Sequence, residues 1–443
     1  MACSHRCPAL MISAMASHQG KTTVTAALAA WHRQQGRRVT VFKTGPDYLD
    51  PLLLEQASGC PAEPLDLWMM GEAACRHALH QAATRSDLIL VEGAMGLFDG
   101  TPSSADLAEH FDLPVAIVIH VQGLAQTTAA VALGLIHYRP ALQITGIVVN
   151  ALGSDRHRAL IEEALDGRIP QLAALPRQTD IQLPSRHLGL VMPSEQSDVS
   201  ERIQRAALLL DGTQLTALPP DAVFPAADIK PPMDRPLRGA RIAVARDAAF
   251  SFLYAANLRL LAALGAEVLF FSPLRDEALP VGYTAVWLPG GYPELHAQPL
   301  ALNQSMHRAL HDAHRRQVPI LAECGGMLYL MTTLETAEGE RYPMAGVLPG
   351  EARLQGRSGC QGMQSAPLPE GVFRGHSHHH SRTVGTLPPI GHCQRARHSA
   401  PGEAIYRQGR TTASYLHLYF PSNPTACAAL FSSTTASGKT VTA

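Results

Sequence analysis

Two short segments, far apart in the chain, carry the residues that could do chemistry. Residues 17–23 read SHQGKTT and residues 319–330 read PILAECGGMLYL. The first has the glycine, lysine and threonines of a nucleotide-phosphate loop, and the second sets a cysteine between a strand pattern and a helix pattern. Such a chain could consume ATP at one site and carry out covalent thiol chemistry at the other. We therefore expect an enzyme that couples two half-reactions.

The phosphate loop lies in the context that its function needs. An apolar strand pattern at residues 9–14 precedes it, and a helix-forming stretch at residues 22–35 follows it. Backbone N–H groups of the loop and the helix N-terminus would hold phosphate oxygens. A second GKT, at residues 438–440, has neither flank, so we interpret that copy as chance.

The loop residues have distinct expected roles. Gly20, Lys21, Thr22 and Thr23 would contact the nucleotide, with Lys21 at its outer phosphates and the Thr22 hydroxyl on Mg²⁺. The full motif has a glycine at position 15, where this chain has Met15, so the match is incomplete. The prediction therefore depends on the flanking elements as well as on the motif.

Two acidic segments follow further strand patterns. Asp47 and Asp50 come after one of them, and Glu92 and Asp99 come after the next. Ligands of open α/β sheets bind outside the carboxyl ends of the strands, and carboxylate oxygens suit Mg²⁺. We expect Asp47 and Glu92 to be metal ligands. The alternative, solvated loop carboxylates, is stronger for Asp50 and Asp99.

Cys324 lies where a nucleophile elbow would place it. Ala322 and Gly326, two residues before and two after, are small, as a strained strand-to-helix turn requires. The N-terminus of the following helix is expected to lower the thiol pKa and favour the reactive thiolate. The alternative is a buried structural thiol.

The sequence also suggests partners for this cysteine. PGGYPE follows another strand pattern, and the N–H groups of Gly290 and Gly291, with that of Gly325, could form an oxyanion hole. The base should be a histidine elsewhere in the chain. Among 21 histidines, His417 in a β-rich aromatic segment is the best candidate, although a lone histidine could equally be structural.

A run of histidines tempts a metal interpretation. Residues 375–382 read GHSHHHSR. There is no second cluster at ligand spacing, and none of the cysteines supports one. We therefore do not expect a functional metal site there.

Alternating strand and helix patterns predict two α/β domains. The first half has the rhythm of a doubly wound, mostly parallel sheet, and a second rhythm begins at Arg241 and weakens beyond Gly350. A proline-rich stretch between them has no regular period and is interpreted as a linker. The strand patterns of the first half are at residues 9–14, 38–42, 88–91, 115–121 and 145–149. The expected boundaries are 1–215, a linker at 216–238, 239–431 and a mobile tail at 432–443.

The composition excludes several classes of protein. The chain has 443 residues, of which 46% are hydrophobic and 16% charged, and its formal net charge is −1. We expect a globular protein with no nucleic-acid partner, no membrane span and no signal peptide. The eight cysteines form no C-x-x-C pair and indicate free thiols of a reducing cytoplasm. A homodimer is one possible assembly.

These residues together resemble a known family, the cobyrinic acid a,c-diamide synthases, also described as hydrogenobyrinic acid a,c-diamide synthases. The resemblance covers nearly the whole chain, from about Leu10 to Phe431. The segments that carry it are SHQGKTTVTAAL, VFKTGPDYLDP, VEGAMGLFDGTPSSADLA, LPSRHLGLV, RIAVARDAAFSFLYAANL, LPGGYPELHA, AECGGMLYL, RGHSHHHSR and ASYLHLYFPSNP.

The resemblance implies a fold and a reaction. It implies an N-terminal P-loop domain similar to dethiobiotin synthetase, joined to a C-terminal class I-like glutamine amidotransferase domain. ATP with Mg²⁺ would convert the a and c acetate carboxylates of cobyrinate or hydrogenobyrinate to acyl phosphates. Ammonia released from glutamine would then attack them, in a step of cobalamin biosynthesis.

The same resemblance assigns roles to individual residues. Cys324 would be the glutaminase nucleophile, and His417 would raise its nucleophilicity. The family's ATP and Mg²⁺ positions fall on Lys21, Thr22, Asp47 and Glu92, and its adenine-reading position falls on Asn150.

Three departures from the expected patterns matter. Met15 replaces a loop glycine, and the histidine run is richer than usual. Ordinary class I amidotransferases have glutamate two residues after the catalytic histidine, where this chain has Tyr419. The family is similar in lacking that glutamate, so the identity of a third triad member stays open.

Two other functions fit parts of the pattern. Cobyric acid synthase shares the architecture but amidates other side chains of the corrin ring, and its chains usually run longer. A P-loop ATPase switch with an inactive amidotransferase domain is a different class, but Cys324 and His417 are both intact. The sequence leaves open whether the ring substrate contains cobalt.

Overall fold

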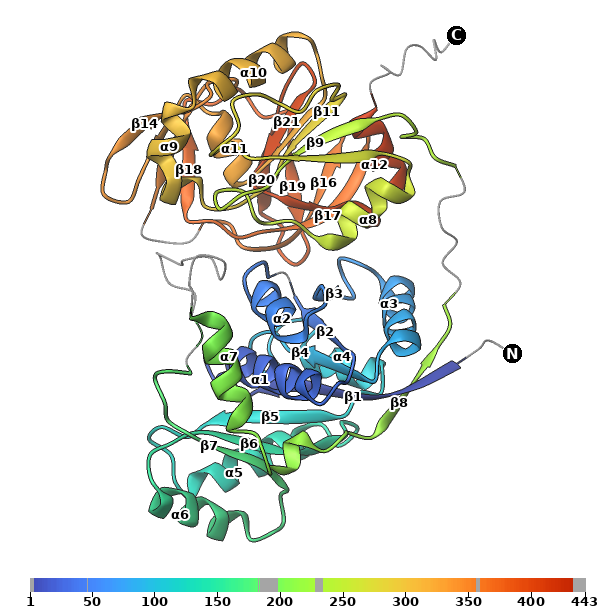
Figure 1. Cartoon of the computed structure of the whole chain (residues 1–443), viewed down its shortest axis with the longest axis vertical. Coiled ribbons are helices and arrows are strands. Elements are labelled where there is room, and N and C mark those ends of the chain that lie inside the picture. Colours follow the sequence, from blue (N-terminus) through green and yellow to red (C-terminus); the bar gives the residue numbers. More distant parts are fainter. Residues whose placement is uncertain are drawn as a thin grey trace. The chain divides into compact units, whose positions relative to one another are not determined.

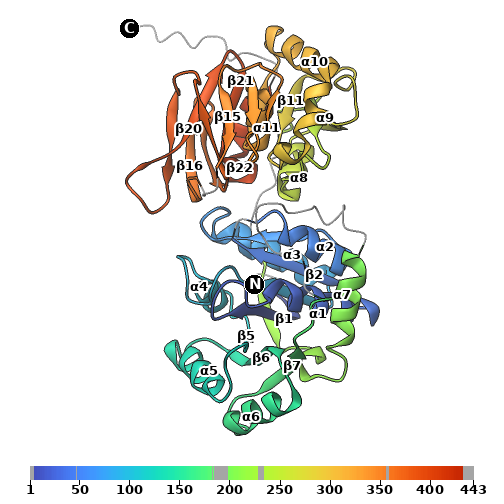
Figure 2. The same cartoon turned by 90° about the vertical axis from the view of Figure 1, so that its left-hand side faces the viewer.

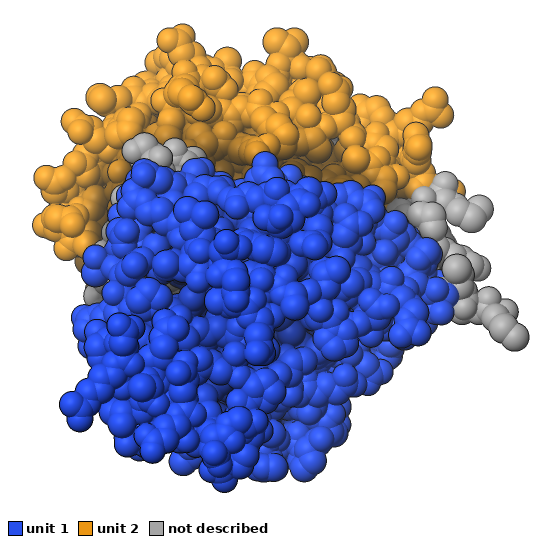
Figure 3. Space-filling model, turned by 60° about the horizontal axis from the view of Figure 1, so that its bottom comes forward, with its two compact units in different colours: residues 1–229 blue, residues 230–443 orange. Residues whose placement is uncertain are grey.

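The computed structural model describes residues 4–45, 47–181, 183, 198–227, 234–355 and 359–432. The chain divides into two compact units, residues 1–229 and 230–443, which have different colours in Figure 3. Each unit is built on its own large sheet. The second GKT, the predicted tail beyond Ser432 and all of LPSRHLGLV except its first residue lie outside the described residues.

The first unit is built on an eight-stranded sheet in the order β3-β2-β4-β1-β5-β6-β7, with β8 beside β1. All neighbours on the main path pair in parallel. Strands β2, β4 and β5 are buried along nearly their whole length, and β4 and β5 are apolar except at their last residue. The strands are β1 Ser4–Ala14, β2 Val39–Thr44, β3 Glu63–Leu65, β4 Leu88–Glu92, β5 Val115–His120, β6 Ile144–Leu152, β7 Gln171–Pro176 and β8 Asp221–Pro225.

Helices cover both faces of this sheet (Figure 1, Figure 2). Helices α1, α2 and α7 share a hydrophobic core with one face, and α3, α4, α5 and α6 share a core with the other. The helices are α1 Lys21–Gln34, α2 Asp50–Ser58, α3 Glu72–Arg85, α4 Ser104–His110, α5 Thr127–Tyr138, α6 Asp155–Leu165 and α7 Val199–Leu208, with a short 3-10 helix η1 Gln214–Thr216.

The long strand β1 pairs with different strands along its length. Ser4–Pro8 pairs antiparallel with β8, and from Ala9 onward β1 pairs in parallel with β4. Phe224 of β8 is buried in the core that includes α3, whereas Val223 faces outward and is 50% exposed. The linker expected at 216–238 is therefore wrong in this part. A short strand between prolines is too brief to show a period in the sequence.

The second unit is built on a ten-stranded sheet in the order β10-β9-β11-β12-β21-β20-β19-β16-β17-β22. Its first five strands are parallel, and the later neighbours pair antiparallel. A smaller sheet has the order β14-β13-β15-β18. The strands are β9 Arg241–Ala245, β10 Glu267–Phe271, β11 Ala285–Leu288, β12 Ile320–Glu323, β13 Thr333–Glu335, β14 Arg341–Pro343, β15 Glu351–Leu354, β16 Gly362–Leu368, β17 Gly371–Ser377, β18 Ser381–Val384, β19 Gly391–Arg395, β20 Pro401–Gln408, β21 Thr411–Ser414 and β22 His417–Tyr419.

Helices also cover both faces of the larger sheet in this unit. Helices α8 and α12 share one core with it, and α9, α10 and α11 share the other. The helices are α8 Ala255–Ala263, α9 Ala297–Leu302, α10 Gln304–Arg315, α11 Gly325–Leu330 and α12 Pro424–Phe431, with short 3-10 helices η2 Pro293–His296 and η3 Phe420–Ser422.

The predicted fold class is confirmed in both units. Strands β1, β2, β4, β5 and β6 occupy the five strand patterns of the first half, and the second rhythm starts with β9. Beyond Gly350 the chain forms β15 to β22, of which the sequence predicted only the β-rich segment around His417. Most of these strands are antiparallel and mix buried with exposed positions, so they lack the apolar runs of buried parallel strands.

Two expectations from the composition can be compared with the described residues. Within them, no helix combines the length and the apolar character that a membrane span needs. The seven cysteines that the structure describes are all free thiols.

Shortening Phe224 to alanine tests the place of β8 in the first unit. Loss of the buried ring should destabilise this unit by about 3–5 kcal/mol, because a core phenylalanine contributes transfer free energy and packing. Amide hydrogen exchange in β1, measured by mass spectrometry, should then be faster. Val223→Ala, on the outward face of the same strand, is the matched control. Equal effects of the two substitutions would contradict the assignment of β8 to this core.

Candidate active sites

The phosphate loop connects β1, which ends at Ala14, to α1, which begins at Lys21. Gly20 caps this helix with φ 93°, a left-handed conformation that favours glycine. A Cβ on Gly20 would lie 2.4 Å from Nδ2 of Asn150, which donates a hydrogen bond to the Gln19 carbonyl at 2.9 Å. The structure thus places Asn150 beside the loop, and its adenine-reading role stays a prediction.

Lys21 is buried at the start of α1, and its ammonium group turns back to the loop. Its Nζ donates to the carbonyl of Ala16 at 3.0 Å and to that of Met95 at 2.6 Å. Burial, and then the charge of Lys43, lower the pKa of Lys21 to about 8. A charged phosphate oxygen is a stronger acceptor than a carbonyl, so nucleotide phosphates could take over these hydrogen bonds. Thr23 is partly exposed in the same turn.

Thr22 and Glu92 form the part of this site that fits a metal ion. The Thr22 hydroxyl donates to Oε1 of Glu92 at 2.8 Å, and Oε2 of Glu92 is buried with no hydrogen-bond partner among the described residues. Burial raises the pKa of Glu92 to about 7, against the opposing charge of Lys43. A divalent cation would satisfy the buried carboxylate, and hydroxyl and carboxylate oxygens are the ligands that Mg²⁺ prefers.

The other three carboxylates have local partners. Oδ1 of Asp47 accepts two backbone N–H groups at the start of α2, at 3.0 and 3.2 Å. Asp50 lies 3.8 Å from Nζ of Lys43, and Oδ2 of Asp99 accepts the N–H of Gly96 at 3.0 Å. The hydrogen bond within its own loop therefore accounts for the carboxylate of Asp99, whereas a metal role for Asp47 stays a prediction.

Sequence reasoning missed Lys43, a buried lysine at the carboxyl end of β2. Its Nζ lies 3.6 Å from Oε1 of Glu92 and 3.8 Å from Oδ2 of Asp50. The available signal was a lysine inside VTVFKT, a strand that is buried along its whole length. Because Lys21 is also buried here, the site has two positive charges where negative phosphates would bind.

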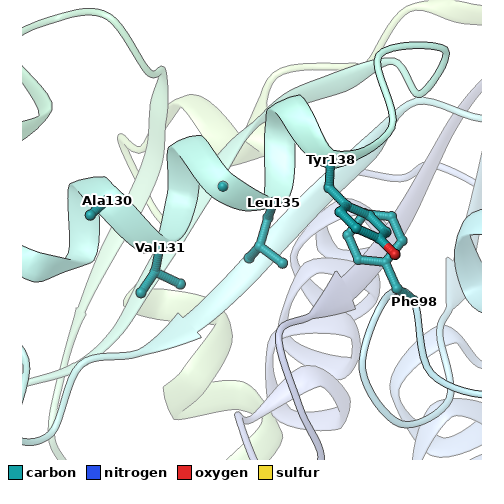
Figure 4. A pocket seen from close by; sticks show the side chains of 6 residues that line it. Phe98, Ala130, Val131, Leu135 and Tyr138 are labelled. Atoms are coloured by element: carbon teal, nitrogen blue, oxygen red, sulfur yellow. The ribbon is translucent and has the colours of Figure 1, made fainter.

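An apolar hollow beside α5 has no side chain suited to these chemistries. Figure 4 shows Val131, Leu135 and Tyr138 on this helix, with the ring of Phe98 beside that of Tyr138. The two ring centroids are 4.7 Å apart. No residue that lines the hollow is charged, so we assign no reaction to it.

The histidine run has other partners than a metal cluster. In the described ranges, no group of three or more His, Cys, Asp or Glu side chains is arranged to hold a metal ion. His379 lies 2.9 Å from Oε1 of Glu403 and stacks on the ring of Tyr415 at 3.7 Å. His379, one of two buried histidines of the run, therefore takes part in the packing of the second unit.

Cys324 lies on a strained turn between β12, which ends at Glu323, and α11. Its backbone has φ 45° and ψ −108°, a conformation that residues with a side chain rarely adopt. A Cβ on Gly326 would lie 2.2 Å from the carbonyl oxygen of Leu288, so only glycine fits below the turn. The N–H of Cys324 donates to the Ser414 carbonyl at 2.8 Å. The structure thus shows the elbow that the small neighbours predicted.

The predicted base and oxyanion glycines lie together at this elbow. A Cβ on Gly290 would lie 2.0 Å from Cε1 of His417, so the imidazole lies directly against that glycine. A Cβ on Gly325 would lie 2.8 Å from the carbonyl oxygen of Gly291. His417 is 2% exposed, in β22. Segments that are far apart in sequence thus place His417 against the Gly290 turn, and Gly291 of that turn against the residue after Cys324.

Burial controls the ionisation of the two reactive groups. Burial, and then the Glu294 carboxylate, raise the pKa of the Cys324 thiol, although the N–H of Gly325 opposes them. The lowering that we expected from the helix N-terminus is therefore wrong for this structure, because loss of solvent outweighs one backbone N–H. Burial, and then two neighbouring histidines, lower the pKa of His417 to about 3. The resting pair is a neutral thiol and a neutral imidazole that can accept a proton.

Two family models match the chain one after the other. The CobQ/CobB/MinD/ParA nucleotide binding domain matches residues 10–191, and the CobB/CobQ-like glutamine amidotransferase domain matches residues 241–425. The first match contains the phosphate loop, and the second contains Cys324 and His417.

Curated relatives cover nearly the whole chain. The hydrogenobyrinate a,c-diamide synthase of Pseudomonas aeruginosa is 52% identical over 96% of this chain and 97% of its own. The enzyme of that name in Stutzerimonas stutzeri is 52% identical over 96% of this chain and 99% of its own. The cobyrinate a,c-diamide synthase of Herminiimonas arsenicoxydans is 46% identical over 96% of each chain. This chain belongs to the cobyrinate and hydrogenobyrinate a,c-diamide synthase family.

Membership of this family makes the protein a glutamine-dependent ligase of cobalamin biosynthesis that uses ATP. The predicted pairing of two half-reactions is confirmed, because a nucleotide-binding model and an amidotransferase model each match one unit. The relatives named above favour neither cobyric acid synthase nor an ATPase switch.

Gly290→Ala should impair amidation with glutamine as nitrogen donor and spare amidation with ammonium. The added Cβ would overlap the His417 ring, and a displacement of about 1 Å in an active site costs on the order of 10²-fold in rate. Glutamine-dependent amidation should fall by that factor, and amidation with added ammonium should persist. Gly391→Ala is the matched control, because a Cβ there meets nothing within 4 Å. Unchanged glutamine use by Gly290→Ala would contradict the contact between Gly290 and His417.

Proposed function

We propose that this protein amidates the a and c acetate carboxylates of cobyrinate or hydrogenobyrinate, with glutamine as nitrogen donor. The observation that carries the proposal is the packing of His417 against Gly290 and of Gly291 against the residue after Cys324, in a chain that also has a phosphate loop. Relatives of 52% and 46% identity are named for hydrogenobyrinate and for cobyrinate, respectively. Both rings are therefore candidate substrates, and assays of the two acceptors side by side decide between them.

In the proposed glutaminase reaction, Cys324 attacks the side-chain amide carbon of glutamine. The neutral imidazole of His417 takes the thiol proton and passes it to the leaving nitrogen, so the carbon–nitrogen bond breaks and ammonia departs. The N–H groups of Gly290, Gly291 and Gly325 are proposed to stabilise the oxyanion. Water then cleaves the thioester, which releases glutamate and restores the thiol.

In the proposed ATP reaction, a ring carboxylate oxygen attacks the γ-phosphorus of ATP, and ADP departs. Lys21, Lys43 and the loop N–H groups offset the negative charge of the phosphates. Thr22, Glu92 and Asp47 are proposed to hold Mg²⁺, which neutralises phosphate charge when bound. The result is an acyl phosphate, whose carbonyl carbon ammonia attacks while phosphate leaves.

Two further features of the protein are proposals. We place the reaction in the cytoplasm, and the free thiols of the described residues support a reducing compartment. We also propose that the protein forms a homodimer, and a measurement of its molar mass in solution by light scattering tests this.

Cys324→Ser tests the assignment of the nucleophile. A serine hydroxyl at this position has no accessible anionic form near neutral pH, so glutamine should fail as nitrogen donor. Added ammonium should still support amidation, because the phosphate loop lies in the other compact unit. The measurement is formation of the diamide product from each nitrogen source.

Lys21→Ala is the complementary control for Cys324→Ser. Loss of the phosphate-facing charge should lower amidation about 10²-fold or more with either nitrogen source. Continued use of glutamine by Cys324→Ser would refute the nucleophile assignment. Normal amidation by Lys21→Ala would refute the phosphate role of the loop.

The Mg²⁺ requirement should depend on pH through Glu92. With its pKa raised to about 7, protons compete with Mg²⁺ for this carboxylate at lower pH and cease to compete at higher pH. The Mg²⁺ concentration that gives half-maximal amidation should therefore fall as pH rises from about 6 to about 8. Initial rates over a Mg²⁺ titration at each pH measure this. A half-maximal concentration that is constant over this range would contradict the role of Glu92.

Neutral variants complete the metal test. Glu92→Gln and Asp47→Asn should each raise the half-maximal Mg²⁺ concentration by about tenfold or more, with partial recovery of activity at high Mg²⁺. Asp87→Asn is the control, since Asp87 pairs with the exposed Arg38 at the other end of β4. Full activity of both test variants at low Mg²⁺ would show that these carboxylates are ordinary loop residues.

A further inference from the structure

Glu323, the residue before the nucleophile, is an acid buried in the second unit and 2% exposed. Its Oε1 accepts the N–H of Leu418 at 2.8 Å, and its Oε2 accepts Nε1–H of Trp287 at 2.9 Å. Burial raises the pKa of this carboxyl to about 8, and the two hydrogen bonds oppose the shift. Burying an acid costs free energy of folding that an apolar side chain of the same size would avoid.

The two hydrogen bonds join the three strands that build the glutaminase site. Glu323 ends β12 and is covalently next to Cys324. Leu418 follows His417 in β22, and Trp287 lies in β11, which ends just before the Gly290 turn. One side chain therefore connects the strands that carry the nucleophile, the base and the oxyanion glycines.

The strand that carries the base is held by side chains along one edge. β22 is the last strand in the order of the ten-stranded sheet, and it pairs with β17. Along its other edge, Asn257 donates to the Leu418 carbonyl and accepts the N–H of Phe420, both at 2.8 Å, while Glu323 accepts the N–H of Leu418. Of these two side chains, Asn257 comes from α8 and Glu323 comes from the strand of the nucleophile.

The position two residues after the histidine has no carboxylate. Tyr419 stands there, and its ring meets that of Tyr254 edge-on with centroids 5.8 Å apart. A carboxylate at that position would be able to orient the imidazole directly. In this chain Glu323 instead reaches the backbone of the residue next to His417.

We propose that Glu323 is a positioning residue for glutamine hydrolysis, which sets the place of His417 relative to Cys324 through the Leu418 N–H. This inference rests on the proposed roles of Cys324 and His417. A carboxyl group held at both oxygens has little freedom, and it is fixed to the strand of the nucleophile. The hydrogen bond from the Leu418 N–H therefore joins the strand of the base to the strand of the nucleophile and holds the two strands at a fixed separation.

Glu323→Met and Glu323→Gln, in the full-length protein, test the proposal. Methionine keeps the length of the side chain but accepts neither hydrogen bond, so kcat for glutamine hydrolysis should fall about 10²-fold. The KM for glutamine should stay within about threefold, because the site still binds the amide. Glutamine at this position keeps one oxygen for the Leu418 N–H, so most of the rate should return. Ammonium-dependent amidation should be unchanged in both variants.

Trp287→Phe is the matched comparison. It removes the donor to Oε2 and leaves the hydrogen bond from Leu418 to Oε1, so kcat should fall by no more than about threefold. A purely structural role would lower the unfolding temperature of the Glu323 variants and leave the kcat of the folded protein unchanged, and this result would overturn the proposal. Equal losses of kcat in Trp287→Phe and Glu323→Met would also overturn it.

Two further comparisons keep the test decisive. If Glu323→Met does not fold, Glu323→Gln decides: retention of most of kcat supports the proposal, and a fall of about 10²-fold, although the hydrogen bond from the Leu418 N–H can still form, overturns it. Glutamine hydrolysis by Cys324→Ser is measured in parallel. If Cys324→Ser hydrolyses glutamine normally, the proposed function of the site fails. If it does not, and Glu323→Met keeps its kcat, only the role of Glu323 fails.

Discussion

The carboxyl ends of parallel strands open onto one edge of a sheet, and both reaction sites of this chain are built on that constraint. In the first unit, β1, β2 and β4 lead into the phosphate loop, Asp47 and Glu92. In the second unit, neighbouring strands β11 and β12 lead into the Gly290 turn and Cys324. Residues that are distant in sequence become neighbours because parallel strands lie side by side with their carboxyl ends at the same edge of the sheet.

Burial sets the chemistry of the groups gathered at these edges. In the first unit, two lysines and a glutamate share a region with little solvent. There, a neighbouring opposite charge stabilises the charged form of each group, and a neighbouring like charge destabilises it. In the second unit, burial makes the thiol of Cys324 a weaker acid and the imidazole of His417 a weaker base. In the free protein the proton therefore resides on the sulfur and not on the imidazole.

The second site also stores backbone strain. A residue such as Cys324 at positive φ costs about 1–3 kcal/mol relative to a relaxed conformation. The hydrogen bond from its N–H to Ser414 and the close packing of Gly326 on Leu288 hold the turn in place. The same packing leaves the sulfur next to the Gly325 N–H, where a developing charge would be stabilised. The strained turn thus fixes the position of the thiol, and the turn can form only because the neighbouring residues are small.

The sequence by itself determined the fold class, the loop at Gly20–Thr23, the elbow at Cys324 and the glycine turn at Gly290. Each of these depends on a few adjacent residues, whose steric needs and periodicity can be recognised locally. Buried parallel strands gave the clearest signal, because both of their faces are apolar. The first strand of the second unit, β9, was predicted in the same way.

Tertiary structure alone decided what depends on contacts across the chain. It showed that β8 pairs with the first part of β1 and that Lys43 lies beside Glu92. It also showed that the Cys324 thiol is a weaker acid than its place before helix α11 suggested. It also placed His417 on Gly290 and joined Glu323 to Leu418. Desolvation and hydrogen bonding between distant segments depend on which atoms surround a group in three dimensions, and no local pattern of residues carries that information.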